Sequence, residues 1–405
     1  MYVGAEGGVS CGEGLRNVKS ITAISKPESG HQINPGNKTF TRNWGIDCLR
    51  GISILFVVLN HPGLGFRLPL SKSALIEIFP KRFLSAISFN GYEAVFIFFV
   101  ISGFLIASRV LNQYGTLQNI DWRDFYRRRA SRILPLLLVL LAVLSLLHVV
   151  GFKDYVIAKA GQSLGGASTA ALGLYLNWYE GQTTWLPASW DVLWSLSIEE
   201  VFYIGFPLVC LFVPRVTLIV LLVLLALSLP FTKMLLDGNE IWQEKAYLPG
   251  MSAIATGVLC AVAAQYWPTP RRAMVWAMLA VGSAGLFMVF FFGPLVWKAL
   301  RHGNMLVLTS AAAFTILACH NLCKQQHAPH GLGWLAAMGR LSYEIYLSHM
   351  FTVLTMVALY RAYAPDLRWG FLVYLPCIAL CVFQGAILER TITVPCEKYL
   401  RRGMQ

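Results

Sequence analysis

The chain has 405 residues, of which 56% are hydrophobic and only 13% are charged, and its formal net charge is +13. Soluble domains average about 25% charged residues, so this composition excludes an ordinary soluble globular protein and favours one whose solvent is lipid. The positive charge does not indicate nucleic-acid binding, because no basic helix interleaved with aromatic residues occurs. Lys and Arg collect instead in the cytoplasmic loops of membrane proteins.

The first 44 residues are polar, and no apolar core of a signal peptide precedes Ile46. We expect 1–44 to form a disordered cytoplasmic tail. Apolar runs of about 20 residues, the length that crosses a bilayer, then recur to about residue 390. We therefore predict an all-α, polytopic transmembrane bundle over 45–390, followed by a cytoplasmic tail over 391–405. About ten spans are expected, at 46–64, 92–111, 133–151, 194–213, 216–231, 247–266, 273–293, 303–322, 340–360 and 369–389.

The distribution of Lys and Arg between the loops indicates whether a further run, 164–178, also crosses the membrane. With the N-terminus inside and ten spans, 21 Lys and Arg fall on the inner side and 12 on the outer side. If 164–178 crosses, the counts become 18 and 15. Because Lys and Arg favour the cytoplasmic side, we expect ten spans, both termini in the cytoplasm, and 152–193 as an outer loop.

The first predicted span contains two ionisable residues, Arg50 and His61, eleven positions apart. At 3.6 residues per turn they share one helix face to within about 20° and lie roughly 16 Å apart along it. Ionisable residues inside spans are costly and usually functional. A ligand with an anionic head and a long thin arm, such as acyl-CoA, fits this stripe. In the structural alternative, Arg50 is a snorkelling anchor and His61 an interfacial residue.

Two further motifs have both a structural and a functional interpretation. Ser102 and Gly103, in the second span, are small residues, and close helix packing is the favoured explanation for them. In the next inner loop, Arg129 and Arg132 lie one helical turn apart and could hold phosphate as a fork. The alternative is that this arginine cluster only anchors the topology. The position of Arg50 on the same side of the membrane favours the phosphate site.

Two carboxylates, Glu199 and Glu200, stand at the mouth of the fourth span, at the level expected for His61. Glu199 could hold one imidazole nitrogen and so leave the other free as a base. The alternative is a carboxylate favoured by the helix dipole. In the ninth span, His349 either lines the same cavity or has a structural role.

We expect neither a metal site nor a bound cofactor. Most of the nine cysteines lie in apolar runs, where a free Cys behaves as a small hydrophobe. The segment from Cys319 through His320 to Cys323 offers only three candidate ligands and no partner cluster.

Five motifs in a fixed order resemble those of the acyltransferase-3 family, from about residue 44 to 390. They occupy 49–61, 99–105, 126–135, 194–203 and 341–349. The resemblance implies an O-acyltransferase of the bacterial inner membrane. Such enzymes take acyl groups, usually acetyl, from cytoplasmic acyl-CoA and transfer them to hydroxyls of surface or exported glycans or lipid-linked saccharides.

The resemblance also implies roles for individual residues. The family's essential arginine–histidine pair falls on Arg50 and His61, its inner-loop arginines on Arg129 and Arg132, and its acidic residue on Glu199. These positions imply acyl-CoA binding by the three arginines and catalysis by His61 and Glu199. The residues expected to line the cavity are Ser102, Trp194, Ser195, Tyr343 and His349. The chain departs from the family at Asn60 and Leu347, where aromatic residues are common.

The resulting hypothesis is that His61 deprotonates the acceptor hydroxyl, either directly or in a route through an acyl-histidine. A transporter of a small anion or a lipid-linked sugar is the alternative, since it would also need membrane-embedded Arg, His and Glu. It predicts an inverted repeat, and none is visible in the sequence. A scaffold in a polysaccharide export complex is the third interpretation. The sequence identifies neither the acceptor, the acyl length nor the oligomeric state.

Overall fold

The computed structural model describes residues 42–64, 68–267, 270–323, 328–363 and 366–402. Within these ranges the regular elements are all helices and none is a strand, as the predicted all-α class requires. Almost all of the predicted tail 1–44 lies outside the described residues. Beyond residue 391, where a second tail was expected, the described chain continues as a helix to Arg402.

The long helices are α1 (Trp44–Leu64), α3 (Gly91–Tyr114), α4 (Trp122–Val150), α8 (Trp194–Phe212), α9 (Arg215–Leu227), α12 (Tyr247–Tyr266), α13 (Arg272–Leu300), α14 (Gly303–Leu322), α16 (Ser342–Tyr363) and α17 (Tyr374–Leu388). The shorter α-helices are α2 (Lys81–Phe89), α5 (Leu164–Leu172), α6 (Leu176–Gln182), α7 (Ala188–Asp191), α10 (Leu229–Leu235), α11 (Glu240–Lys245), α15 (Gly333–Arg340) and α18 (Val394–Arg402). Tight 3₁₀ turns form η1 (Leu70–Lys72), η2 (Ala74–Glu77), η3 (Leu117–Asn119), η4 (Lys153–Tyr155) and η5 (Leu367–Val373), and η6 (Glu389–Thr393) is a π-helical turn.

The protein is a multi-pass membrane protein with close to the expected number of spans. Within the described ranges, eight helical segments are long and apolar enough to cross a membrane, or nine if the bent pair α9 and α10 is one span. The predicted span 46–64 is not among them, although it forms the 21-residue helix α1. Polar residues on α1 lower its hydropathy, and most of its side chains are buried by other helices.

Two predicted apolar runs are broken in the structure. The run 216–231 bends by 49° between α9 and α10. The ambiguous run 164–178 divides into α5 and α6 at Leu174, whose φ of 61° is outside the helical region. Nine residues of helix α5 reach only about 14 Å, which is less than half of a hydrocarbon core of about 30 Å. Neither short helix is long enough to cross by itself.

Local chemistry explains where the long helices begin, end and bend. The Asp121 side chain accepts hydrogen bonds from the backbone N–H groups of Arg123 and Asp124 and so caps α4. Gly151, with a φ of 88°, ends the same helix in the left-handed conformation that glycine adopts freely. Within α13 the backbone is non-helical at Phe292, two residues before Pro294, because proline lacks an N–H and displaces the preceding turn.

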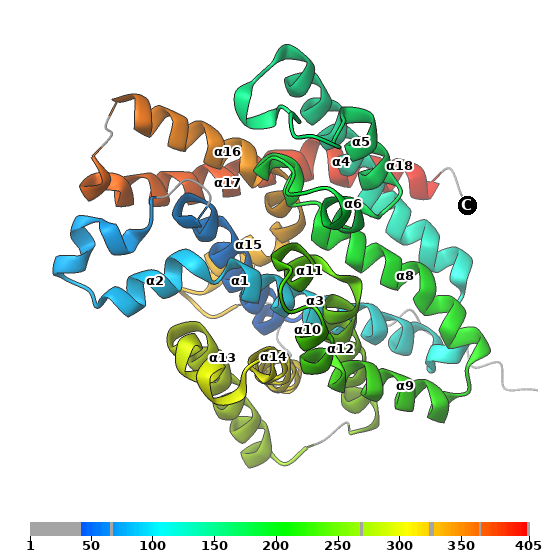
Figure 1. Cartoon of the computed structure of the whole chain (residues 1–405). Coiled ribbons are helices and arrows are strands. Elements are labelled where there is room, and N and C mark those ends of the chain that lie inside the picture. Colours follow the sequence, from blue (N-terminus) through cyan, green and yellow to red (C-terminus); the bar gives the residue numbers. More distant parts are fainter. Residues whose placement is uncertain (1–41, 65–67, 268–269, 324–327, 364–365, 403–405) are drawn as a thin grey trace, which may run out of the picture. The chain divides into compact units, whose positions relative to one another are not determined.

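Helices α1 and α3 occupy the middle of the described bundle (Figure 1). Helix α1 packs on α3, α15 and α16, while α3 also packs on α12. Helices α13 and α14 form a pair on one side, and α4 and α18 pack together on the opposite side (Figure 1).

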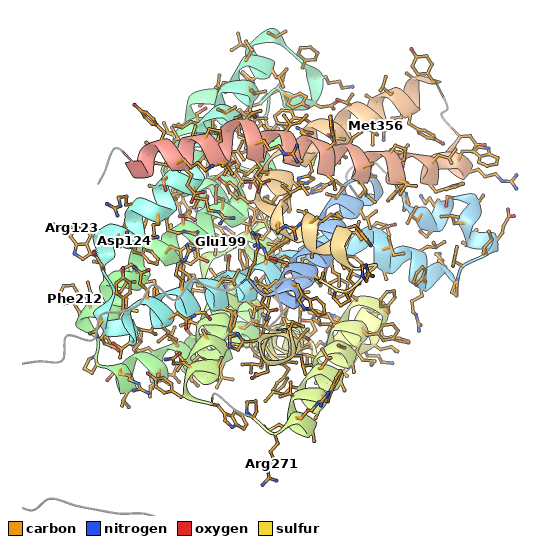
Figure 2. All side chains as sticks on the ribbon, turned by 180° about the vertical axis from the view of Figure 1, so that it is seen from behind. Arg123, Asp124, Glu199, Phe212, Arg271 and Met356 are labelled. Atoms are coloured by element: carbon orange, nitrogen blue, oxygen red, sulfur yellow. The ribbon has the colours of Figure 1, made fainter. Side chains whose placement is uncertain are left out.

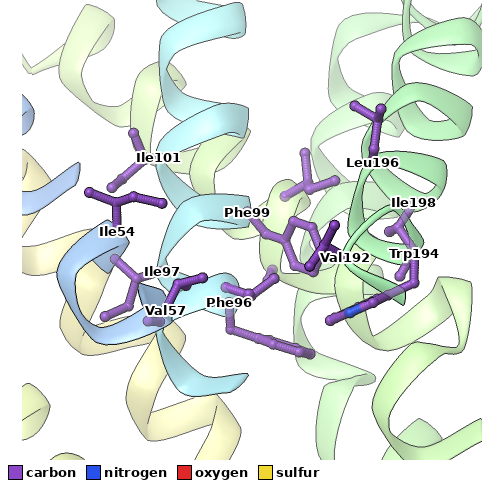
Figure 3. Close-up of a cluster of buried hydrophobic side chains, with 14 of the residues drawn as sticks. Ile54, Val57, Phe96, Ile97, Phe99, Ile101, Val192, Trp194, Leu196 and Ile198 are labelled. Carbon is purple, nitrogen blue, oxygen red and sulfur yellow. The ribbon is translucent and has the colours of Figure 1, made fainter. Parts of the chain in front are cut away.

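The apolar core joins three of these helices (Figure 3). Ile54 of α1 lies against the Ile97 and Ile101 side of α3, whereas Phe99 of α3 faces Trp194 of α8. The Phe99 and Trp194 rings meet edge to face, with centroids 6.1 Å apart. Helix α3 is therefore held between α1 and α8 by its two opposite faces.

Glycines bring two pairs of helix backbones into direct contact. A Cβ on Gly103 of α3 would lie 2.0 Å from the carbonyl oxygen of Ile254 on α12, and one on Gly257 would lie 2.0 Å from that of Val100. Between α1 and α15, a Cβ on Gly51 would lie 2.1 Å from the carbonyl oxygen of Leu335. The expected packing role of Gly103 is thus explained, because only a residue without a side chain permits this approach.

We predict that Gly103→Ala destabilises the protein, since the added methyl group must separate α3 from α12. Overpacking of this kind costs about 1–3 kcal/mol, so the unfolding midpoint in detergent should fall by several degrees. Gly205→Ala on α8 is the matched control, because a Cβ there meets nothing within 4 Å. Equal midpoints for the two variants, measured by thermal unfolding with size-exclusion detection, would contradict the close contact.

Candidate active site

Helix α1 holds both Arg50 and His61, because it continues from Trp44 to Leu64. The Nη2 atom of Arg50 donates a hydrogen bond of 2.7 Å to Oγ of Ser342, the first residue of α16. Arg50 and His61 are each partly exposed, whereas most of α1 is buried. The two predicted residues therefore stand about three turns apart on one helix, with accessible surface at each end of the stripe.

The predicted arginine fork on α4 consists of one paired and one exposed side chain. Arg129 forms a 2.5 Å ion pair with Glu200 Oε1, and its guanidinium lies 3.9 Å from the centre of the Tyr203 ring. Arg132, one turn further along, is exposed and forms no ion pair with any described residue. Its charge acts on Arg50, so the structure brings these two cations into one region. Arg132 and Arg50 are consequently better placed than Arg129 to meet an anionic ligand.

The structure does not bring Glu199 to His61, which was one of the two interpretations of this carboxylate. Glu199 Oε1 accepts a 3.0 Å hydrogen bond from Ser102 Oγ, and its charge interacts with Arg129 and Arg50. The ring nitrogens of His61 make no hydrogen bond with any described residue. Glu199 is partly exposed and is seen over the middle of the bundle in Figure 2. Its contacts place it with Ser102 and the arginines and not with the histidines. The reason is that α8 crosses α3 and α4 at the level of Ser102 and Arg129, one and a half turns beyond its first residue, Trp194.

A second histidine takes the place beside His61. The rings of His61 and His349 have centroids 4.9 Å apart and are tilted by 47°. His349 is completely buried. Its Nδ1 lies 2.7 Å from the carbonyl oxygen of Tyr346. His349 was expected to line the site or to be structural, and its ring does contact the predicted catalytic histidine.

The other predicted cavity residues have defined partners. Ser195 Oγ is 2.6 Å from the hydroxyl of Tyr346. The Tyr343 hydroxyl donates a 3.0 Å hydrogen bond to the carbonyl oxygen of Ile133, and Trp194 is buried against Phe99. These partners of Tyr343 and Trp194 would also be expected if the two residues had only a structural role.

Helical spacing explains how these contacts join into a polar line. On α16, Ser342, Tyr346 and His349 recur at intervals of four and three residues and so share one face. On α8, Ser195 and Glu199 are likewise one turn apart. The line runs from Arg50 and Arg132, past Glu199 and Ser102, through Ser195 and Tyr346, to the pair of His349 and His61.

A buried ion triad near the histidine end was not foreseen from the sequence. Lys245, only 1% exposed, lies 2.8 Å from Glu180 and is also paired with Asp191, and its ammonium group lies over the Trp185 ring. The charge of Asp191 acts on His61. Burial, followed by the Asp191 carboxylate, raises the pKa of Glu180 well above its ordinary value, and Lys245 opposes that shift. The signal available in the sequence was a Lys and an Asp placed at the borders of two predicted spans.

The fold and the site together define a polytopic membrane protein with a line of Arg, Glu, Ser, Tyr and His side chains inside its helices. Over residues 43–388 the sequence matches the acyltransferase-3 family, described as an acyltransferase domain. The chain belongs to this family, as its five motifs predicted.

Relatives of known name give further similarity. The chain is 25% identical over 378 residues to O-acetyltransferase OatA of Staphylococcus aureus strain NCTC 8325, a match that covers 87% of this chain and 57% of the relative. It is 24% identical over 389 residues to the putative O-acetyltransferase SACOL0978 of Staphylococcus aureus strain COL, with the same coverage. The match therefore spans little more than half the length of these relatives. No solved structure matches the chain.

We predict that Lys245→Met strongly destabilises the protein, because Glu180 and Asp191 then lose their buried counter-charge. Removing one partner of a buried ion pair costs about 3–5 kcal/mol. Arg368→Met is the matched control, since the Arg368–Glu77 pair is exposed and such pairs contribute about 0–1 kcal/mol. Thermal unfolding in detergent should show a large fall for Lys245→Met alone. Adding Glu180→Gln to Lys245→Met should recover part of the loss, and a Lys245→Met midpoint equal to that of the control would contradict the triad.

Proposed function

We propose that the protein is a membrane O-acyltransferase of the bacterial inner membrane. It moves an acyl group, most simply acetyl, from cytoplasmic acyl-CoA to a hydroxyl of a surface or exported glycan or a lipid-linked saccharide. The observation that carries this proposal is the polar line between the arginines and the histidine pair, in a chain of an acyltransferase family. The names of the matched relatives, O-acetyltransferase, support transfer of acetyl to oxygen.

The arginine end of the line suits the phosphates of coenzyme A. Arg132 is exposed, Arg50 is partly exposed, and the paired Arg129 adds charge one turn away. Guanidinium groups bind phosphate with planar, bidentate hydrogen bonds. From there to His61 the rise along α1 is roughly 16 Å, a length that the pantetheine arm can follow to bring the thioester to the imidazole. Under this proposal the arginine end faces the cytoplasm with both termini, in line with the excess of Lys and Arg there.

His61 is the candidate base. Its imidazole accepts the proton of the acceptor hydroxyl while the oxygen attacks the thioester carbonyl, so a C–O bond forms as the C–S bond breaks. The proton then passes to the departing CoA thiolate, which returns His61 to its neutral form. The same position serves a two-step route in which the imidazole first carries the acyl group. Lipid-facing helices around the site keep the reacting groups together and limit hydrolysis.

A surface hollow supports acceptor access near the histidine end. It has a volume of about 340 Å³ and is lined by Lys153, Asp154, Val156, Ala158, Lys159, Gln162, Leu186, Pro187, Ala188 and Leu354. Leu354 follows His349 on α16 by five residues, or about 7.5 Å of helix. A mainly apolar floor with a few polar groups is typical of small-molecule sites, and one sugar unit of the acceptor would fit here.

We predict that His61→Asn abolishes acyl transfer while the protein remains folded in the membrane, because the amide cannot accept the proton. Loss of a positioned general base costs about 100- to 10,000-fold in rate. Membranes are incubated with radiolabelled acetyl-CoA, and label transferred to glycan is measured for the wild type and the variant. A His61→Asn protein that still labels glycan would refute the scheme, and a wild type that moves saccharide without consuming acetyl-CoA would indicate a transporter.

We predict that Arg132→Met raises the KM for acetyl-CoA about tenfold with little change in kcat, the effect of losing one charge-assisted contact made equally in the ground and transition states. Arg128→Met is the matched control, because Arg128 is already paired with Asp124 at 2.6 Å. Initial rates at varied acetyl-CoA concentration distinguish the two variants. If Arg132→Met leaves KM unchanged, the phosphate site lies elsewhere.

A further inference from the structure

His349 is enclosed by the bundle and cannot reach a substrate directly. Its side chain has no accessible surface, and its ring meets the rings of His61 and Tyr346 at centroid distances of 4.9 and 5.9 Å. His61, by contrast, is partly exposed. A role for His349 in the reaction must therefore act through His61.

The backbone fixes the proton of His349 on one nitrogen. Nδ1 faces the carbonyl oxygens of Tyr346, at 2.7 Å, and Ile345, at 3.2 Å. Carbonyl oxygens only accept hydrogen bonds, so Nδ1 must carry the hydrogen. In the neutral imidazole the other nitrogen, Nε2, then has a lone pair and no hydrogen. The tautomer of this ring is thus set by its own helix.

That lone pair has no donor within the described part of the chain. Nε2 of His349 is buried and makes no hydrogen bond there. An unsatisfied buried acceptor destabilises the folded state, and such groups in folded proteins call for an explanation. The ring beside it is that of His61, and two imidazoles joined by one N–H···N bond have centroids roughly 5 Å apart. The observed centroid distance of 4.9 Å is of this size, so a change in ring orientation would be enough to form the bond.

We infer that His349 is a positioning residue for His61 in the proposed acyl transfer. Its Nε2 accepts the N–H of one His61 nitrogen, which leaves the lone pair of the other nitrogen facing the acceptor hydroxyl. This inference rests on the proposed function and gives His349 the orienting task that the sequence assigned to Glu199. When His61 takes the hydroxyl proton it becomes an imidazolium, and the hydrogen bond to His349 stabilises that cation. The proton leaves on the CoA thiolate, so His349 is unchanged over the cycle.

The surrounding charges agree with this assignment. Glu199 is occupied by Ser102 and by the charges of the arginines. Asp191 acts on His61 electrostatically, but it is ion-paired with Lys245. His349 is therefore the neighbour of His61 with an uncommitted acceptor atom.

Two substitutions of similar size separate this role from a structural one. His349→Gln places an amide where Nε2 lies and can still accept the His61 N–H, whereas His349→Asn places its amide where Nδ1 lies and leaves the Nε2 position empty. We expect His349→Asn to lower kcat for transfer from acetyl-CoA about 100-fold. We expect His349→Gln to remain within about tenfold of the wild type, and the KM for acetyl-CoA to stay within about twofold in both variants. Ser348→Ala, which removes only a hydrogen bond to the backbone of the same helix, should match the wild type.

The outcomes distinguish failure of the inference about His349 from failure of the proposed function. If the wild type transfers acetyl and His349→Asn is as active as His349→Gln, the inference is overturned and the proposed function survives. Equal loss in both variants, with wild-type thermal midpoints, also overturns it, because a hydrogen-bond acceptor at Nε2 is then irrelevant. If the wild type shows no transfer dependent on acetyl-CoA, the proposed function fails first.

Discussion

An ionised side chain inside a lipid-facing bundle needs a partner, because no water is present to solvate it. This constraint organises the interior described above. Glu200 pairs with Arg129, and Lys245 pairs with Glu180 and Asp191. Once these groups are accounted for, Arg50, Arg132 and His61 are left with capacity for further interactions. Under the proposed function, Arg50 and Arg132 bind the donor molecule and His61 meets the acceptor.

Helix packing determines which uncommitted groups meet. Direct backbone contact at Gly51 draws α15 against α1, so Ser342, just after α15, reaches Arg50. Helix α3 contacts α8 on the face opposite to α1. There the packing of Phe99 against Trp194 sets the position of α8, so that Glu199 meets Ser102. These two polar contacts thus depend on a glycine contact and an aromatic contact nearby.

Hydropathy and helical period predicted much of this protein, and their limits have physical causes. Period 3.6 placed Arg50 and His61 on one face of one helix, because that relation is internal to the helix. The partner of Glu199 depends on how far α8 is shifted along α3 and how it is rotated about its own axis. The spacing of residues within one helix does not specify either quantity. His349 was singled out by its motif, but its tautomer depends on the carbonyl oxygens of its own turn. Lys245 escaped notice because it lies where a span begins, and there a charge is usually solvated.

The glycine contacts between α3 and α12 also constrain motion. Where two backbones touch without intervening side chains, neither helix can slide or rotate without a clash, so α3 and α12 must move as one body. The neighbours of α3 on its other faces meet it through longer side chains, whose rotamers can change on the nanosecond scale. An opening between these helices should therefore be a shear of α1 or α8 past a fixed pair, and a shear of α8 would have to separate the Phe99 and Trp194 rings.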